Sequence, residues 1–253
     1  MKIFGLLLAV ISLSGIILAQ VKKPSPAPVK LPYSKSLQAV VVTTPSWASV
    51  QGTARLFERK TADSAWKQVG DSFPIVVGRN GLGPDSEFTG LKGEAAKHEG
   101  DGKSPAGFFP LTFAFGSSTD PAKTALPYTK LDEYTECVDD VKSTHYNTVV
   151  NRMQVGNFDW NSSEKMLAVG PPYESGIFVG YNSYPPVRGN GSCIFLHIWK
   201  DATTGTSGCT AMERTNLEKI LAWVRQEKNP YLVQLPEAIY AAHEKSWNLP
   251  NFK

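Results

Sequence analysis

The chain has 253 residues, a formal net charge of +3 at pH 7 and 42% hydrophobic residues. Lys22 and Lys23 are its only basic run, so we expect no nucleic-acid binding. Residues 37–253 are long enough for one domain with a sizeable core and contain no internal repeat.

The N-terminal residues predict export. Lys2, a short apolar run and the small residue Ala19 form a secretory signal peptide over residues 1–19, with cleavage before Gln20. An uncleaved N-terminal anchor is the alternative, although the run is short for a membrane span. The following proline-rich residues, 20–36, are expected to form an extended linker, because their composition buries little apolar surface.

Short segments rich in Val, Ile and Phe, separated by Gly and Pro, predict strands. They cover residues 37–43, 53–57, 73–77, 108–113, 166–169, 177–181 and 194–199. Strands of this number and spacing predict a mainly β domain of the β-rich α+β class, spanning residues 37–253.

Two helices are expected near the C-terminus. Thr215 and Glu218 form a capping box ahead of an apolar stripe, and Asn229 and Pro230 would end this first helix. The second helix is expected over residues 237–245.

Between residues 116 and 161 the periodicity is lost. Such a stretch is either a functional lid or a mixture of helix and loop. Asp139 and Asp140 are not expected to act as a carboxylate pair, because adjacent side chains in an extended segment point apart. His98, Glu99 and Asp101 are interpreted as a solvated turn, because no second histidine stands at metal-ligand spacing.

His197 and Cys209 carry the strongest chemical signal. His197 ends an apolar run that predicts a buried strand, and a polar, glycine-containing turn leads from it to Ser207, Gly208 and Cys209. An imidazole beside a thiol can take its proton and make it a nucleophile, and Gly208 permits close backbone approach. The alternative is that both are ordinary core residues.

These residues resemble a known family. HIWKDATTGTSGCT, residues 197–210, resembles the His…[Ser/Thr]-x-Gly-Cys signature of YkuD-type L,D-transpeptidases, and HEGDGKSPAGFFPL, residues 98–111, resembles an element upstream of it in that family. The resemblance covers roughly residues 37–250 and implies a YkuD-like mixed β-sheet sandwich with one or two helices after the cysteine. It also favours a lid beside Cys209 over residues 116–161.

The resemblance implies an exported cysteine acyltransferase, in the periplasm or cell envelope of a bacterium. Cys209 would be the nucleophile, His197 its base, and the backbone N–H groups of Cys209 and Gly208 or Thr210 the oxyanion donors. Ser207 is the candidate, as backbone or hydroxyl, to hold the other imidazole nitrogen. No cofactor or metal is implied.

Attack on a peptidoglycan stem peptide would release D-alanine and leave a Cys209 thioester. Capture by an amine gives a 3-3 cross-link, whereas capture by water would make the protein an L,D-carboxypeptidase. The expected partners are stem peptides, with carbapenem-type β-lactams as inhibitors. The expected roles are peptidoglycan biosynthesis, cell wall organisation and cell shape.

The chain departs from the commonest signature, because Ser207 replaces a second histidine, and Thr210 and Ala211 stand where an Arg or Asn is usual. We therefore expect Arg188 or Arg214 to grip the substrate carboxylate. Tyr146 and Asn147 are further candidates for peptide contact, although packing and turn formation are the alternative for them.

Two other protein classes are alternatives. Papain-type and NlpC-type peptidases place the cysteine before the histidine, which is the opposite of the order here. A non-catalytic wall-binding module, with the linker as spacer, is the other alternative.

Three cysteines leave one unpaired if the other two are bridged. We expect a Cys137–Cys193 disulfide and a free Cys209. A bridge involving Cys209 and the absence of any bridge stay open, because connectivity does not follow from sequence.

Overall fold

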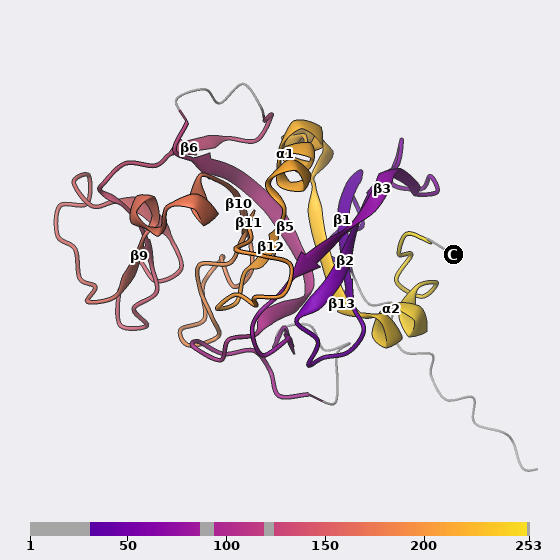
Figure 1. The fold of residues 1–253 in the computed structure, drawn as a ribbon, viewed down its shortest axis with the longest axis horizontal. Helices are drawn as coiled ribbons and strands as arrows, with labels where there is room; N and C mark the ends of the chain where they lie inside the picture. Colours follow the sequence, from indigo (N-terminus) through magenta and orange to yellow (C-terminus); the bar gives the residue numbers. More distant parts are fainter. Residues whose placement is uncertain (1–30, 87–93, 119–123, 252–253) are drawn as a thin grey trace, which may run out of the picture.

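The computed structural model describes residues 31–86, 94–118 and 124–251 (Figure 1). The expected signal peptide, residues 1–19, and most of the expected linker lie outside the described residues. Within the described part, no helix is long and apolar enough to cross a membrane.

The described strands, in chain order, are β1 (Gln38–Thr44), β2 (Gln51–Glu58), β3 (Lys67–Val76), β4 (Leu82–Pro84), β5 (Ser104–Gly116), β6 (Tyr128–Lys130), β7 (Thr135–Val138), β8 (Val149–Asn151), β9 (Ser163–Lys165), β10 (Ser175–Val179), β11 (Phe195–Ile198), β12 (Thr210–Met212) and β13 (Tyr231–Pro236). The α-helices are α1 (Arg214–Trp223) and α2 (Glu237–His243), and the 3-10 helices are η1 (Met166–Val169), η2 (Pro171–Tyr173) and η3 (Gln226–Lys228).

The main sheet closes on itself. Its strands follow the order β10, β11, β12, β3, β2, β1, β13, β5, and β5 pairs again with β10. The long β5 makes this closure, because Gly107–Pro110 pair with β13 and Leu111–Gly116 pair with β10. Parallel and antiparallel pairs both occur, so the prediction of a β-rich domain with a mixed sheet is confirmed.

The position of β1 inside the main sheet explains why its sequence is so apolar. Every residue of β1 is buried, and β1 runs parallel to β13 and antiparallel to β2. A strand covered on both faces carries a continuous apolar run rather than an alternating one, as Val40, Val41 and Val42 do. α2 packs on β1 and β13, and α1 packs on β10 and β11.

The folded domain begins earlier than the predicted boundary at residue 37. Tyr33 is buried and stacks on Phe108 with ring centroids 4.7 Å apart. The buried Arg59 donates hydrogen bonds of 2.7 Å to the carbonyls of Ser34 and Ser36. The last residues of the expected linker are thus part of the core, because Tyr33 supplies an apolar ring and Arg59 satisfies the backbone around it.

In the described part of residues 116–161, short strands and loops replace the expected mixture of helix and loop, and the role of a lid stays a prediction. β7 pairs antiparallel with β8 and with β9, which gives a small three-stranded sheet on the left of Figure 1, at β9. The carboxylate of Glu136 in β7 is fully buried there and accepts ion pairs from Arg152 at 2.8 Å and Lys165 at 2.5 Å. The mixture of helix and loop is therefore wrong for this segment.

Residues 166–169 form η1 and not the expected strand. Only Met166 is buried in this turn, and Gly170 follows with φ of +77° before two prolines, so the chain cannot continue as a strand. The apolar residues of this run therefore form an exposed turn, of which only the Met166 side chain packs into the core.

Helix α1 is confirmed, but its ends differ from the prediction. Its N-cap is Glu213, which makes no side-chain capping bond, so the expected box at Thr215 is not formed. The helix stops at Trp223 because the N–H of Arg225 donates to the Gln38 side chain at 2.8 Å. Helix α2 is confirmed over Glu237–His243.

Candidate active site

Two neighbouring strands bring His197 and Cys209 together. β11 and β12 pair in parallel, with His197 opposite Ala211, and Cys209 comes directly before β12. The N–H of Phe195 donates to the Cys209 sulfur at 3.3 Å. Because alternate residues of a strand share a face and Ala211 stands two residues after Cys209, the imidazole and the thiol lie on the same side of the sheet. Tyr173 contacts both, since its ring packs against His197 and its hydroxyl interacts with the Cys209 thiol.

Cys209 is a free and buried thiol. It donates to the Cys193 carbonyl at 3.4 Å and interacts with the hydroxyl of Tyr173. Burial raises the pKa of the Cys209 thiol strongly and Glu164 raises it further, while Phe195, Tyr173 and Lys97 lower it. The resting thiol is therefore protonated and needs a base when it attacks.

His197 is suited to be that base. Its Nδ1 lies 2.8 Å from the carbonyl oxygen of Ile198, which can only accept, so Nδ1 carries the proton and Nε2 keeps its lone pair. Burial lowers the pKa of His197 to about 4, partly opposed by the Ile198 bond. The imidazole is therefore neutral at pH 7.

The expected role of Ser207 in holding the imidazole is not what the structure shows. The Ile198 carbonyl holds it, because the strand backbone itself presents this oxygen to the ring. The Ser207 hydroxyl instead lies 3.3 Å from a guanidinium nitrogen of Arg79, which donates to it.

Two hydroxyls fix the backbone of the nucleophile. Ser104 and Thr206 donate to the Cys209 carbonyl at 2.7 and 2.6 Å, and the Gly208 N–H donates to Thr206 at 3.1 Å. Since the Gly208 N–H is engaged and Thr210 belongs to the ladder between β11 and β12, the expected oxyanion donor that remains is the N–H of Cys209.

A cavity of about 310 Å³ opens beside the thiol. Besides Cys209 it is lined by two cationic side chains, three carboxylic ones and small residues of the neighbouring loops: Arg79, Lys97, Glu99, Gly100, Asp139, Glu164, Ser192, Cys193, Ile194, Ser207 and Gly208. A second cavity, of about 770 Å³, contains neither Cys209 nor His197 in its lining.

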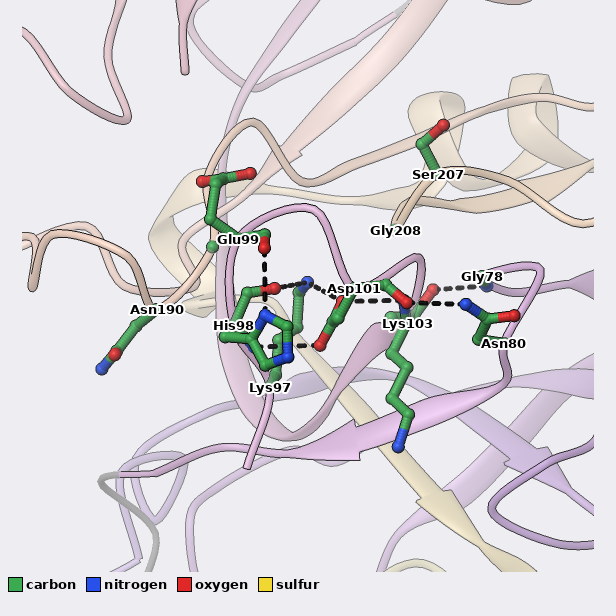
Figure 2. Close-up of polar contacts among 12 residues, drawn as sticks. Gly78, Asn80, Lys97, His98, Glu99, Asp101, Lys103, Asn190, Ser207 and Gly208 are labelled. Carbon is green, nitrogen blue, oxygen red and sulfur yellow. Dashed lines mark hydrogen bonds and ion pairs between the residues drawn. The ribbon is translucent and has the colours of Figure 1, made fainter. Parts of the chain in front are cut away.

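Lys97 lies on the turn predicted as solvated, but its own side chain is buried (Figure 2). Its ammonium is 2.9 Å from the Asp101 carboxylate, which also accepts the N–H groups of His98 and Lys103 at 2.9 Å. Burial opposes ionisation of Asp101, yet these donors outweigh it and lower its pKa. Ser207 and Gly208 lie above this turn in Figure 2, and both line the cavity together with Lys97 of the ion pair.

Glu164 lines the cavity, and Tyr173 lies behind it in contact with its carboxyl group. The Tyr173 hydroxyl donates to Glu164 at 2.6 Å, and its ring packs edge-on against His197 with centroids 5.3 Å apart. Burial raises the pKa of Glu164 to about 7, with the Tyr173 bond lowering it and the charges of Asp139 and Glu99 raising it. Asp139 Oδ1 is a buried oxygen without a hydrogen-bond partner among the described residues.

The Cys137–Cys193 disulfide is present and Cys209 is free, as expected. The bridge joins β7 of the small sheet to the segment that leads into β11. It therefore anchors residues 135–165 beside the thiol, and Asp139 and Glu164 reach the cavity from this anchored segment.

Tyr146 and Asn147 lie close to the site without lining its cavity. The Tyr146 hydroxyl donates to Glu99 at 2.6 Å. The Asn147 amide donates to the carbonyls of Tyr181 and Asn182 and accepts the Cys193 N–H at 2.9 Å. Both side chains hold loops in place, and their contact with a peptide stays a prediction.

The two arginines expected to grip a carboxylate lie elsewhere. Arg214 pairs with Glu174 at 2.6 Å, and Arg188 donates to the Lys142 carbonyl at 3.3 Å. Neither lines the cavity, whereas Arg79 does. Sequence reasoning missed Arg79, Lys97, Glu164 and Tyr173 and gave Asp139 no role, because segments distant along the chain supply them.

A free buried thiol and a neutral imidazole on one side of paired strands, with a charged cavity at the thiol, are the groups that a cysteine acyl-transfer site requires. The model of the YkuD family, the L,D-transpeptidase catalytic domain, matches residues 55–233. The chain therefore belongs to the YkuD family, which acts on peptidoglycan and interacts with β-lactams in general. No curated protein and no solved structure matched the chain.

Proposed function

We propose that the protein is an exported L,D-transpeptidase that forms 3-3 cross-links in peptidoglycan through a Cys209 thioester. One observation carries the proposal most strongly, namely a protonated thiol on the same side of the sheet as an imidazole whose tautomer leaves Nε2 free to take a proton. Family membership supplies the substrate class, peptidoglycan stem peptides.

The proposed first half-reaction is acylation. His197 takes the Cys209 proton, and the sulfur attacks the amide between the diamino acid at stem position three and the following D-alanine. The N–H of Cys209 stabilises the oxyanion. His197 then gives its proton to the departing amine, so D-alanine leaves and a thioester remains.

Arg79 is the best-placed residue to hold a substrate carboxylate. Its guanidinium lines the cavity, and its backbone N–H donates to Thr206 of the nucleophile loop at 2.8 Å. Lys97, the other cation of the cavity, is already paired with Asp101. An arginine can bind a carboxylate through two parallel hydrogen bonds, which would fix the D-alanine end of the donor.

The acceptor is proposed to be the side-chain amine of a second stem. Asp139 and Glu164 in the cavity are acceptors suited to an ammonium group, which favours an amine over water. Hydrolysis of the thioester would make the protein an L,D-carboxypeptidase, the second candidate. The third, a wall-binding module, predicts no chemistry at Cys209.

The test is incubation of the mature protein with disaccharide-tetrapeptides, followed by mass spectrometry. Loss of D-alanine with dimer formation is the expected result, and Cys209→Ala should abolish it. Loss without dimer would establish the carboxypeptidase instead. No change, or a change that persists in Cys209→Ala, would reject both activities. A carbapenem should add its mass to the protein but not to Cys209→Ala.

The proposed location is the periplasm or cell envelope. It rests on the signal-like residues 1–19 and on a disulfide, which persists in oxidising compartments. Cell fractionation with N-terminal sequencing tests it, and a mature chain starting at Gln20 is expected. An intact N-terminus in the membrane fraction would indicate the anchored form.

A further inference from the structure

Tyr173 occupies a central place in the site that the proposed reaction does not use. Its ring packs against Phe115, Phe195 and His197, with centroids 5.3 to 5.7 Å apart. Its hydroxyl donates to Glu164 at 2.6 Å and also interacts with the Cys209 thiol. The phenol therefore connects the sulfur to a carboxyl group.

We propose that Tyr173 and Glu164 are positioning residues for Cys209, and that the protonation state of Glu164 decides where the Tyr173 hydroxyl donates. When Glu164 is neutral, its own O–H donates to the Tyr173 oxygen, and the Tyr173 O–H donates to the sulfur as it gains charge. When Glu164 is ionised, it draws the Tyr173 proton to itself. The sulfur then loses a donor and faces a negative charge.

The surroundings of Glu164 support this arrangement. The groups acting on it are Tyr173 from η2, Asp139 from the segment after β7, Glu99 from the 97–103 turn and the Cys209 thiol. Arg79 and Lys97 line the same cavity. Like charges and burial both favour the neutral acid, so Glu164 changes state around neutral pH, where such an enzyme would work.

The inference rests on the proposed function only for its role in catalysis, since thiol alkylation tests it without a substrate. Rates of Cys209 alkylation by iodoacetamide would be measured from about pH 5.5 to 8.5, and the bridged cysteines would not react. Below the pKa of a thiol the rate rises about tenfold per pH unit. In the wild type this rise should flatten near pH 7, as Glu164 ionises.

The two variants are expected to act in opposite directions. Tyr173→Phe keeps the ring and removes the donor, so alkylation at pH 6 should slow about tenfold. Glu164→Gln removes the charge, so the flattening should disappear and the rate at pH 8 should rise about tenfold. Tyr240→Phe is the matched control. It also removes a buried tyrosine hydroxyl, but this hydroxyl donates to the Pro250 carbonyl, so the variant should leave the pH profile unchanged.

A purely structural role would give a different pattern. Variants that merely loosen the site would change the rate by one factor at every pH, and this would overturn the inference, as would a wild-type profile without a bend. The wild-type profile needs no substitution, so the test holds even if a variant misfolds. Acylation by a tetrapeptide, followed by mass, would then show whether Glu164→Gln also removes an alkaline decline in catalysis. If no acylation occurs at all, the proposed function fails while the alkylation result stands.

Discussion

Burial moves the two titratable groups around Cys209 in opposite directions. The pKa of Glu164 is raised to about 7, and that of His197 is lowered to about 4. The folded protein therefore binds the Glu164 proton more tightly than the unfolded chain does, and the His197 proton less tightly. The contribution of Glu164 to the free energy of unfolding is complete below about pH 4.5 and is lost as the pH rises through 7. The contribution of His197 is complete above about pH 6.5 and is lost as the pH falls towards 4.

Glu164→Gln should isolate the first of these effects. Between about pH 5 and pH 8 the wild type is expected to lose up to about 3 kcal/mol of unfolding free energy through Glu164, and the variant should lose none of it. Urea denaturation of both proteins at the two pH values measures this difference. His197 contributes equally to both proteins, so it cancels. An equal pH dependence in both would show that Glu164 is ionised throughout.

Arg79→Ala tests the proposed carboxylate grip. The KM for a tetrapeptide donor should rise about tenfold to a hundredfold, because a bidentate charged hydrogen bond is lost, while Arg79→Lys should recover only part of it. The matched controls are Arg188→Ala and Arg214→Ala, since these side chains contact Lys142 and Glu174 outside the cavity. If either control raised the KM more than Arg79→Ala does, the substrate carboxylate would be held by Arg188 or Arg214, as the sequence predicted.

How far the site could be predicted depended on the kind of residue. Cys209 and His197 stand in a short motif, and the strand that carries His197 is an apolar run that the sequence predicts over residues 194–199. Glu164 and Tyr173 flank an apolar run that forms η1. The Cys137–Cys193 bridge and the pairing of β7 with β9 bring Glu164 to the thiol, and the packing of η2 on β11 brings Tyr173 there. Such contacts depend on tertiary packing, which one sequence does not encode locally.

At the scale of elements, the disulfide joins the small sheet to the main sheet. It closes a loop with a sequence separation of 56 residues, between β7 and the segment before β11. The strands β8 and β9 each have one partner, so this sheet has little hydrogen bonding of its own to resist opening. The cavity walls at Asp139 and Glu164 should therefore depend on the bridge.

Replacing both bridged cysteines by serine should lower stability by about 2–4 kcal/mol, because the unfolded chain regains loop entropy. Activity should fall more steeply than stability as the temperature rises, since the small sheet carries part of the site. Thermal melts and activity measured in parallel test this. Adding reductant to the wild type should reproduce the loss, while Cys209→Ser should leave the melting temperature nearly unchanged. A double variant with wild-type stability would contradict the proposed anchoring.

The element boundaries show why local signals mislead at the ends of helices. The Thr215 box predicted the right helix and the wrong first residue, because β12 ends at Met212 and the chain turns at once through Glu213. The predicted C-terminal end was too late, because Gln38 of β1 takes the N–H of Arg225. Both corrections come from neighbouring strands and not from the helix sequence.

At the scale of the whole molecule, the buried side chains form two clusters, one in the closed sheet and one around the site. The larger cluster fills the closed sheet around β1, β2 and β13. The smaller one surrounds the site and consists of Phe115, Leu131, Cys137, Met166, Tyr173, Phe178, Cys193, Phe195 and Cys209. Because β5 and β11 belong to both the closed sheet and the smaller cluster, the site rests on the core while its outer wall, the small sheet, does not.

This division predicts how the molecule opens. Peptides covering β7 and β9 should exchange their amide hydrogens through a local opening of lower free energy than peptides covering β1 and β13, because fewer buried apolar contacts hold them. Hydrogen exchange at increasing but sub-denaturing urea, read by mass spectrometry, measures this. β5 serves as the internal control and should exchange with the core, since it pairs with both β13 and β10. If the peptides of β7 and β9 exchanged together with those of β1 and β13, the small sheet and the core would form one cooperative unit.

If they exchanged separately, the small sheet could open locally and admit substrate while β11 and β12, next to His197 and Cys209, stay paired.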